Sequence, residues 1–118
     1  MGEEDCLFCK IASGEIPGKI VYDKHGVVAF EDIHPAAPHH VLFIPRRHVA
    51  SMAELTRQDG EMLGNIFAAA AEYAHEQGLT DPEQGYRFVT NTGKNAGQSV
   101  FHLHFHLLGG RPFAWPPG

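Results

Sequence analysis

Histidine alternates with bulky apolar residues from Phe101 to Leu108, which is the most regular pattern in the chain. Successive side chains of an extended strand point to opposite faces, so this pattern predicts a strand with a histidine row on one face and an apolar row on the other. The histidine row comprises His102, His104 and His106. Each imidazole has two ring nitrogens that need partners, so three of them side by side indicate a chemical role.

Four other apolar segments predict short strands, at residues 19–23, 27–31, 40–44 and 86–90. A turn at residues 24–26 joins the first two of these strands. Prolines in residues 32–38 exclude regular strand pairing there, and Pro45 ends the third strand. Residues 91–99 form a polar, glycine-rich loop that leads into the histidine strand.

Two segments predict helices. Residues 56–59 resemble a capping box, and Gly78 is a typical helix end. Between them runs an apolar stripe with helical spacing, which we assign to the core or to a dimer face: Met62, Ile66, Phe67, Ala70, Tyr73 and Ala74. A shorter helix is predicted over residues 5–13, with Asp5 as its N-cap and Gly14 after its end.

These elements predict an α+β fold, in which an antiparallel sheet of about five strands carries one long helix on one face and has a short N-terminal helix. We expect a single domain over residues 1–118. Within it, residues 1–4 are expected to be a disordered N-terminus and residues 109–118, rich in glycine and proline, an irregular tail.

The composition is that of one ordinary globular domain, with 118 residues, 43% hydrophobic and 19% charged. The formal net charge is −5, so we expect no nucleic-acid partner held by bulk charge. No apolar run approaches the about 20 residues that cross a bilayer. The acidic start of the chain also lacks the apolar segment of a signal peptide. We therefore expect a cytoplasmic protein without a membrane partner.

Two chemical roles compete for the histidine row. Imidazole is a common metal ligand, and two histidines at alternate strand positions can share a zinc ion. Neutral imidazole is also a nucleophile that attacks phosphorus. The loop before the row favours the second role, because Gly93, Gly97 and Ser99 allow backbone N–H groups to approach an anion closely. Asn91, Gln98 and Ser99 add neutral donors, and positioned donors beside a nucleophile suit phosphoryl transfer.

The two cysteines, Cys6 and Cys9, form a Cys-x-x-Cys motif. In a reducing compartment this motif indicates a redox pair or one half of a zinc site rather than a structural disulfide. Free thiols on a short helix are the remaining alternative.

Residues 98–108 resemble the signature of the histidine triad (HIT) superfamily, in which three histidines alternate with apolar residues. The flanking segments are similar to the Hint branch, the histidine triad nucleotide-binding proteins. They are Asp32–Pro38, His40 with Ile44–His48, Gly97–Ser99, Leu108–Arg111 and the ending Trp115–Gly118. The likeness extends from Cys6 to Gly118 and thus over nearly the whole chain.

The resemblance implies a homodimer whose two sheets join into one continuous sheet. It also implies binding of purine nucleoside monophosphates and hydrolysis of the P–N bond in adenosine phosphoramidates, in which AMP is joined to an amine. Two other functions remain open. One is a dinucleoside polyphosphate hydrolase or nucleotidyltransferase on the same fold. The other is a non-enzymatic nucleotide-binding or zinc-binding module.

Carried onto this chain, the resemblance makes His104 the nucleophile that forms a nucleotidyl-histidine. His106 binds phosphate oxygens and assists proton transfer, His40 completes the cluster, and His102 lies beside the nucleophile. Asp32 accepts hydrogen bonds from the ribose, with Ile33 and Phe8 against the base. The remaining substrate contacts are expected on the phosphate and leaving-group side, from Asn91, Gly97, Ser99 and Val100, and from Trp115 near the dimer partner's site.

Some members of the superfamily hold zinc through a Cys-x-x-Cys motif, the histidine after Ile-Pro-x-x and the first histidine of the triad. On this chain those residues are Cys6, Cys9, His48 and His102. Such a closed site would be structural. We expect no catalytic metal, because the histidine cluster takes the place of the metal ion.

Overall fold

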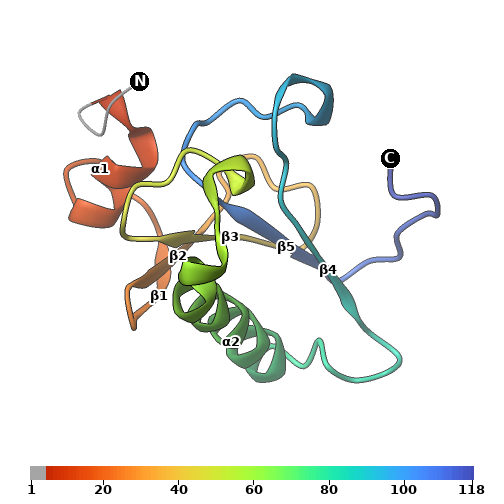
Figure 1. The fold of residues 1–118 in the computed structure, drawn as a ribbon. Helices are drawn as coiled ribbons and strands as arrows, with labels where there is room; N and C mark the ends of the chain where they lie inside the picture. Colours follow the sequence, from red (N-terminus) through yellow and green to blue (C-terminus); the bar gives the residue numbers. More distant parts are fainter. Residues whose placement is uncertain (1–4) are drawn as a thin grey trace.

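The computed structural model describes residues 5–118, so the expectation for residues 1–4 lies outside the described residues. Five antiparallel strands form one sheet in the order β1-β2-β3-β5-β4 (Figure 1). The strands are β1 (Ile20–Lys24), β2 (Val27–Glu31), β3 (His39–Pro45), β4 (Tyr86–Val89) and β5 (Phe105–Gly109). Over these residues the α+β prediction is confirmed, and no helix among them is both long and apolar enough to traverse a bilayer.

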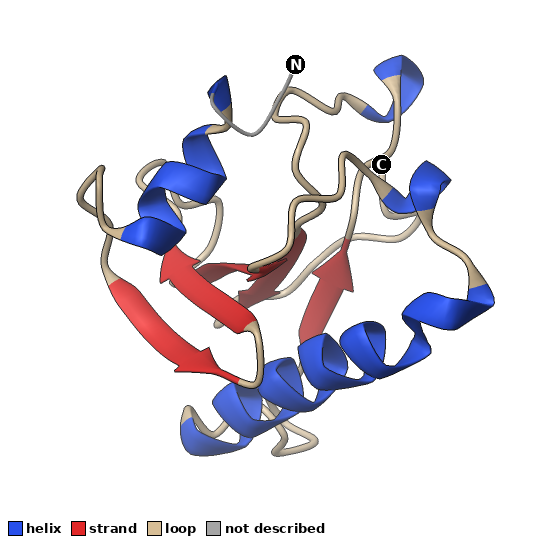
Figure 2. Cartoon of the chain, turned by 60° about the vertical axis from the view of Figure 1, so that its left-hand side comes forward, coloured by secondary structure: helices blue, strands red, loops and turns tan. Residues whose placement is uncertain are grey.

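The sheet is covered on both faces. The short helix α1 (Leu7–Ser13) lies on one side and the long helix α2 (Gly60–Glu76) on the other (Figure 2). Alternate residues of β3 supply the two cores: Val41 and Phe43 pack with α2, and Leu42 and Ile44 pack with α1. This double burial explains why the segment is a continuous apolar run rather than an alternating one.

The ends of the elements follow from local hydrogen bonds. The turn between β1 and β2 has positive φ at both central residues, His25 (54°) and Gly26 (74°), which suits a tight hairpin. Thr56 and Asp59 form the predicted capping box ahead of α2, and Gly78 follows the helix with φ of 74°.

The N-cap of α1 is Cys6 rather than the predicted Asp5. The Cys6 Sγ atom accepts a hydrogen bond from the Cys9 backbone N–H at 3.2 Å. The helix therefore begins at Leu7, and its N-terminus is fixed by a thiol.

The histidine strand is shorter than predicted, because β5 begins only at Phe105. Before it, backbone groups bond outside the ladder: the Leu103 N–H donates to the Val49 carbonyl at 2.6 Å, and the Thr90 hydroxyl donates to the His104 carbonyl at 2.7 Å. The alternation nevertheless persists. Leu103, Phe105 and Leu107 join the α2-side core, and the histidines face α1.

Candidate active site

A cavity of about 300 Å³, here called the histidine pocket, lies between α1 and the sheet. Much of its wall is apolar: Leu7, Phe8, Ile11, Phe30, Leu42 and Val100. Its polar groups include Asp32, Ser99, His104 and His106. An apolar cavity with a few converging polar groups is the usual form of a small-molecule site.

Backbone contacts fix the proton positions on the histidines. The Ala36 N–H donates to His40 Nδ1 at 3.0 Å, so in neutral His40 the proton resides on Nε2. That Nε2 lies 2.9 Å from His106 Nδ1, which must therefore accept. Neutral His106 consequently carries its own proton on Nε2, as a donor for a ligand.

His104 has the opposite arrangement. Its Nδ1–H donates to the His102 carbonyl at 2.7 Å, which leaves the lone pair on Nε2. The His104 ring lies 5.0 Å from the ring of His106 and 5.0 Å from Phe8, centre to centre. The pocket thus presents a nucleophilic nitrogen on His104 beside a donor on His106.

Burial keeps these histidines neutral. It lowers the pKa of His104, opposed by a hydrogen bond to the His102 backbone and by Asp32. Burial, with the neighbouring His104 and His40, lowers the pKa of His106 to about 4. Burial also lowers the pKa of His40, and Asp32 opposes this shift. Near neutral pH the imidazole of His104 is therefore available as a nucleophile.

Asp32 has two contacts. Its Oδ1 accepts from the His34 N–H at 2.8 Å, which stabilises the turn after β2. Its Oδ2 lies 3.4 Å from His40 Nε2. Asp32 therefore holds the loop and faces the histidine cluster from within the pocket wall.

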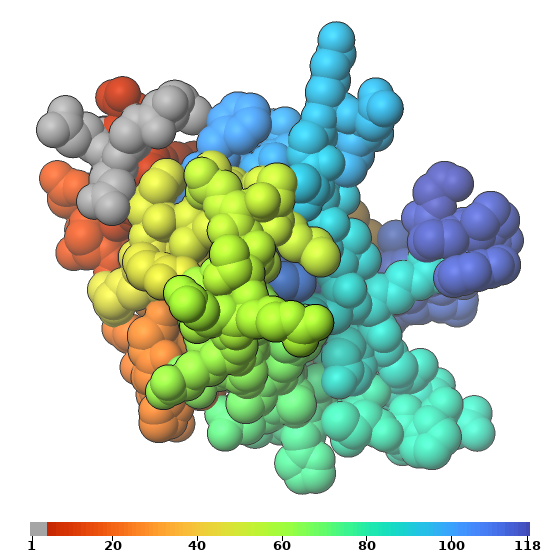
Figure 3. Space-filling model, in the orientation of Figure 1, coloured from red at the N-terminus to blue at the C-terminus, as the bar shows by residue number. Residues whose placement is uncertain are grey.

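The predicted substrate residues fall into two groups. Phe8, Asp32, Ile33, Ser99 and Val100 all line the histidine pocket together with His104 and His106. Asn91, Gly97 and Trp115 are outside its lining. The tail that carries Trp115 projects on the side of the molecule away from α1 (Figure 3), and Trp115 itself is 81% exposed.

Gln98 organises the loop before the triad. Its side-chain NH₂ donates to the carbonyls of Ala50 (2.9 Å) and Val100 (3.2 Å). Its carbonyl oxygen accepts from the Gly93 N–H at 2.9 Å. The amide that the sequence suggested as a ligand donor is therefore engaged with the backbone, and it holds the loop in shape.

Next to the pocket, Cys6, Cys9, His48 and His102 bring four ligand atoms within 4.8 Å of one another. The His102 Nε2–H donates to the Pro45 carbonyl at 2.8 Å, so its Nδ1 lone pair faces Cys6 Sγ at 3.1 Å and Cys9 Sγ at 3.4 Å. His48 Nδ1 lies 3.4 Å from Cys9 Sγ. Two thiols and two imidazoles, one of them already oriented by a backbone carbonyl, make a donor set that fits a tetrahedral metal ion.

Asp32, His40 and His106 form a second group with ligand atoms equally close. Here the donor set does not fit. His40 Nε2 carries a proton as long as Nδ1 accepts from the Ala36 N–H, and a protonated nitrogen cannot bind a metal ion. This group is arranged for hydrogen bonding.

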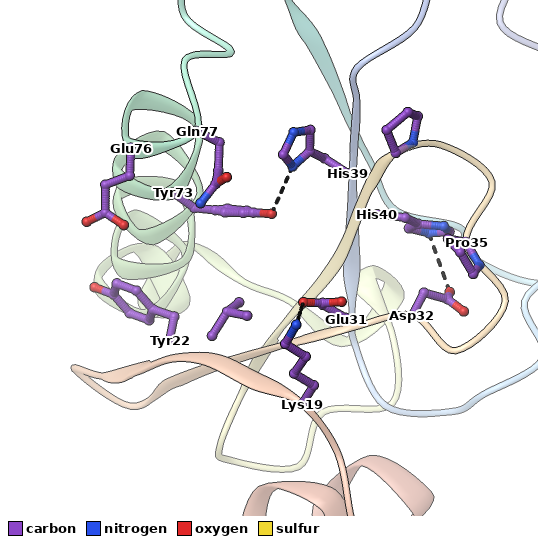
Figure 4. Close-up of a pocket in the computed structure, with 12 residues that line it drawn as sticks. Lys19, Tyr22, Glu31, Asp32, Pro35, His39, His40, Tyr73, Glu76 and Gln77 are labelled. Carbon is purple, nitrogen blue, oxygen red and sulfur yellow. Dashed lines mark hydrogen bonds and ion pairs between the residues drawn. The ribbon is translucent and has the colours of Figure 1, made fainter.

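A second cavity, of about 480 Å³, lies on the α2 side of the sheet (Figure 4), and no local sequence pattern indicated it. His39 is half-buried there, and its Nδ1 lies 3.3 Å from the Tyr73 hydroxyl. Figure 4 shows Asp32 and His40 turned toward each other, away from Tyr73. The alternation of β3 thus gives adjacent histidines different surroundings, with His39 against α2 and His40 beside His106.

Comparison with known proteins places these features in a family. Residues 5–112 match the family described as "Scavenger mRNA decapping enzyme C-term binding". An uncharacterized HIT-like protein of Synechocystis is 46% identical over 115 residues, which cover 98% of each chain.

Solved structures agree with this result. A HIT family hydrolase from Legionella pneumophila superposes with a TM-score of 0.92 at 47% identity, over 97% of this chain and 100% of the other. A histidine triad protein from Clostridium difficile gives a TM-score of 0.90 at 38% identity, over 97% of each chain.

The pKa shift of His106 predicts how stability varies with pH. Between pH 6.5 and about 4 the unfolded chain protonates this histidine while the folded protein keeps it neutral. The free energy of unfolding should therefore be highest above pH 6.5 and fall as the pH drops toward 4. His106→Asn should flatten this dependence in urea titrations, whereas His25→Asn, on the exposed hairpin turn, should not. Equal slopes for wild type and His106→Asn would contradict the assignment.

Proposed function

We propose that this chain, which belongs to the histidine triad (HIT) superfamily, is a hydrolase of the Hint branch that cleaves the P–N bond of adenosine phosphoramidates and releases AMP. The observation that carries the proposal is the paired orientation of two imidazoles in the histidine pocket. His104 directs a lone pair, and His106 a proton, toward the same cavity.

The shape of the pocket supports a nucleoside monophosphate. Phe8, Ile11 and Leu42 provide flat and aliphatic surface for a purine, with the exposed Ile33 at the rim. Asp32 offers a carboxylate to the ribose hydroxyls, and Ser99 lies on the side where we place the phosphate. In this pose the α-phosphorus lies against His104 Nε2.

The proposed first step is an in-line attack of His104 Nε2 on the α-phosphorus, which breaks the P–N bond. The imidazole of the resulting nucleotidyl-histidine is cationic, and its Nδ1–H already points at the His102 carbonyl. The His106 Nε2–H donates a hydrogen bond to the phosphate and stabilises the charge that develops there. The departing amine takes its proton from water as the P–N bond breaks, and the second step releases a proton that restores the balance. Water subsequently attacks phosphorus, restores His104 and releases AMP.

We further propose that zinc occupies the site formed by Cys6, Cys9, His48 and His102. When bound, zinc is structural and supplies no step of the reaction. The four ligands tie the start of α1 to the end of β3 and to the segment before His104. Phe8, between the two cysteines, packs edge-on against the nucleophile, so the site supports one wall of the histidine pocket.

The dimer is likewise a proposal. Strand β4 lies at the outer edge of the sheet, and Phe67 of α2 is 52% exposed while its ring contacts Phe88 of β4. An open strand edge beside exposed aromatic surface suits pairing with a second copy. Such pairing would extend the sheet across two protomers.

The nucleophile is tested by mass spectrometry. A rapidly quenched reaction with an adenosine phosphoramidate should show an AMP-sized adduct on the wild type and none on His104→Ala. His104→Ala should lose turnover yet keep AMP binding, because the pocket wall remains. His75→Ala, which changes an exposed histidine of α2 outside the pocket lining, serves as the control. Turnover near wild type in His104→Ala would refute the assignment.

Leaving-group preference is tested with a substrate panel. AMP-amine conjugates should be cleaved with higher kcat/KM than diadenosine polyphosphate or a nucleotide sugar. A preference for the polyphosphate would instead identify a dinucleoside polyphosphate hydrolase. Binding of AMP without turnover of any substrate would identify a nucleotide-binding module.

The metal site is tested by elemental analysis of the purified protein. We expect about one zinc ion per chain in the wild type and a loss of zinc in Cys9→Ser and His48→Asn. His25→Asn should keep the metal. Chelation should lower the melting temperature and leave AMP binding measurable at low temperature. Loss of AMP binding at a temperature where the protein stays folded would contradict a purely structural role.

A further inference from the structure

The C-terminal tail is bound to the loop that orients His40. The Arg111 Nε–H donates to the Ala36 carbonyl at 3.0 Å, and its Nη1 donates to the Pro112 carbonyl at 2.9 Å. The approach is close: Gly110 has φ of 94°, and a Cβ built there would lie 2.9 Å from Pro38 Cβ. Only glycine allows the tail to pass the loop at this distance.

Ala36 connects this contact to the catalytic cluster. Its carbonyl accepts from Arg111, and its N–H donates to His40 Nδ1. His40 Nε2 is in turn 2.9 Å from His106 Nδ1. A continuous series of hydrogen bonds therefore runs from the tail to the histidine that faces the pocket.

A second arginine holds the tail without touching the loop. The guanidinium carbons of Arg111 and Arg87 lie 4.4 and 5.3 Å from the centre of the Phe113 ring. Arg87 Nη2 also donates to the Ala114 carbonyl. Both arginines thus anchor the tail, and of the two only Arg111 also bonds to Ala36.

We propose that Arg111 is a positioning residue for the reaction: by holding the Ala36 backbone it keeps His40 in the tautomer that donates to His106. The kinetic part of this inference rests on the proposed function, whereas the tautomer part does not. The alternative is that Arg111 merely anchors the tail.

The geometry explains why this position needs an arginine. One planar guanidinium donates from Nε to the loop, donates from Nη1 to its own tail and places its face over Phe113. A lysine ammonium is a single point of charge and has no second donor on its stem, so it cannot make these three contacts together.

The test is an NMR measurement of the histidine ring nitrogens in the full-length protein. In the wild type, long-range ¹H–¹⁵N spectra should show His40 as a single tautomer with the proton on Nε2. In Arg111→Met, His40 should show averaging between tautomers. Arg111→Lys retains a cation beside Phe113 and should show the same averaging at His40. This second variant tests the proposal if Arg111→Met does not fold.

Kinetics provide a second readout, with the smallest substrate, the phosphoramidate whose leaving group is ammonia. We expect kcat of Arg111→Met to fall about tenfold, because a misoriented His40 no longer fixes His106. KM should stay within about twofold, because the pocket wall is untouched. A rise in KM with unchanged kcat would overturn a positioning role.

Arg87→Met is the matched control, because it removes contacts with the same tail but keeps the hydrogen bond between Arg111 and the Ala36 carbonyl. It should retain the wild-type His40 spectrum and kcat. Equal effects of the two substitutions would show that Arg111 only anchors the tail, and an unchanged His40 spectrum in the folded Arg111 variants would refute the proposal. If the wild type lacks phosphoramidase activity while the His40 spectrum changes as expected, the proposed function fails and the positioning role stands.

Discussion

The site depends on one constraint. A neutral imidazole has a proton on one ring nitrogen and a lone pair on the other, and a hydrogen bond to the backbone determines which nitrogen carries the proton. The Ala36 N–H assigns His40, the Pro45 carbonyl assigns His102, and the His102 carbonyl assigns His104. In each histidine one ring nitrogen is engaged by the backbone, and the other nitrogen can contact a side chain or a ligand. As a result, His102 points a lone pair at thiols, and His104 points one into the histidine pocket.

The sheet is interrupted before β5, and this leaves the His102 carbonyl outside the ladder. Within a regular ladder, an N–H of a neighbouring strand would already engage this carbonyl, and His104 could reach it only as a second donor. The chain before β5 instead bonds to Val49 and Thr90, which leaves the His102 carbonyl to the imidazole. The departure from the predicted strand therefore favours the orientation of His104 on which the proposed activity rests. Burial on the α1 side then lowers the pKa values of His104 and His106 and keeps the imidazoles neutral.

The sequence predicted features that depend on side-chain type and period. Alternation in residues 101–108 placed the three histidines on one face. The capping box at Thr56 and Asp59 closes a short 3-10 helix (Arg57–Asp59) directly before α2, and Gly78 follows the end of α2. The sequence did not predict the N-cap Cys6, because a thiol is a rarer cap than the carboxylate of the neighbouring Asp5. It did not predict the start of β5, because that depends on hydrogen bonds to residues that only the tertiary fold brings close. His39 was missed for the same reason. Its partner Tyr73 lies on α2, and local sequence does not report that contact.

The division of the triad between two sites follows from the same interruption. His106 lies within β5 and pairs across the ladder with Leu42, so its side chain shares a face with His40 and the pocket. His102 lies outside the ladder, and its ring contacts the Pro45 carbonyl and Cys6 Sγ. His104 stands between them, with its carbonyl held by Thr90 and its Nδ1–H by His102. The proposed nucleophile is thus fixed from both sides, by the thiol–imidazole cluster through His102 and by Thr90, which follows β4. This arrangement pre-orients Nε2 before a substrate binds, and a pre-oriented nucleophile needs little reorganisation when it attacks phosphorus.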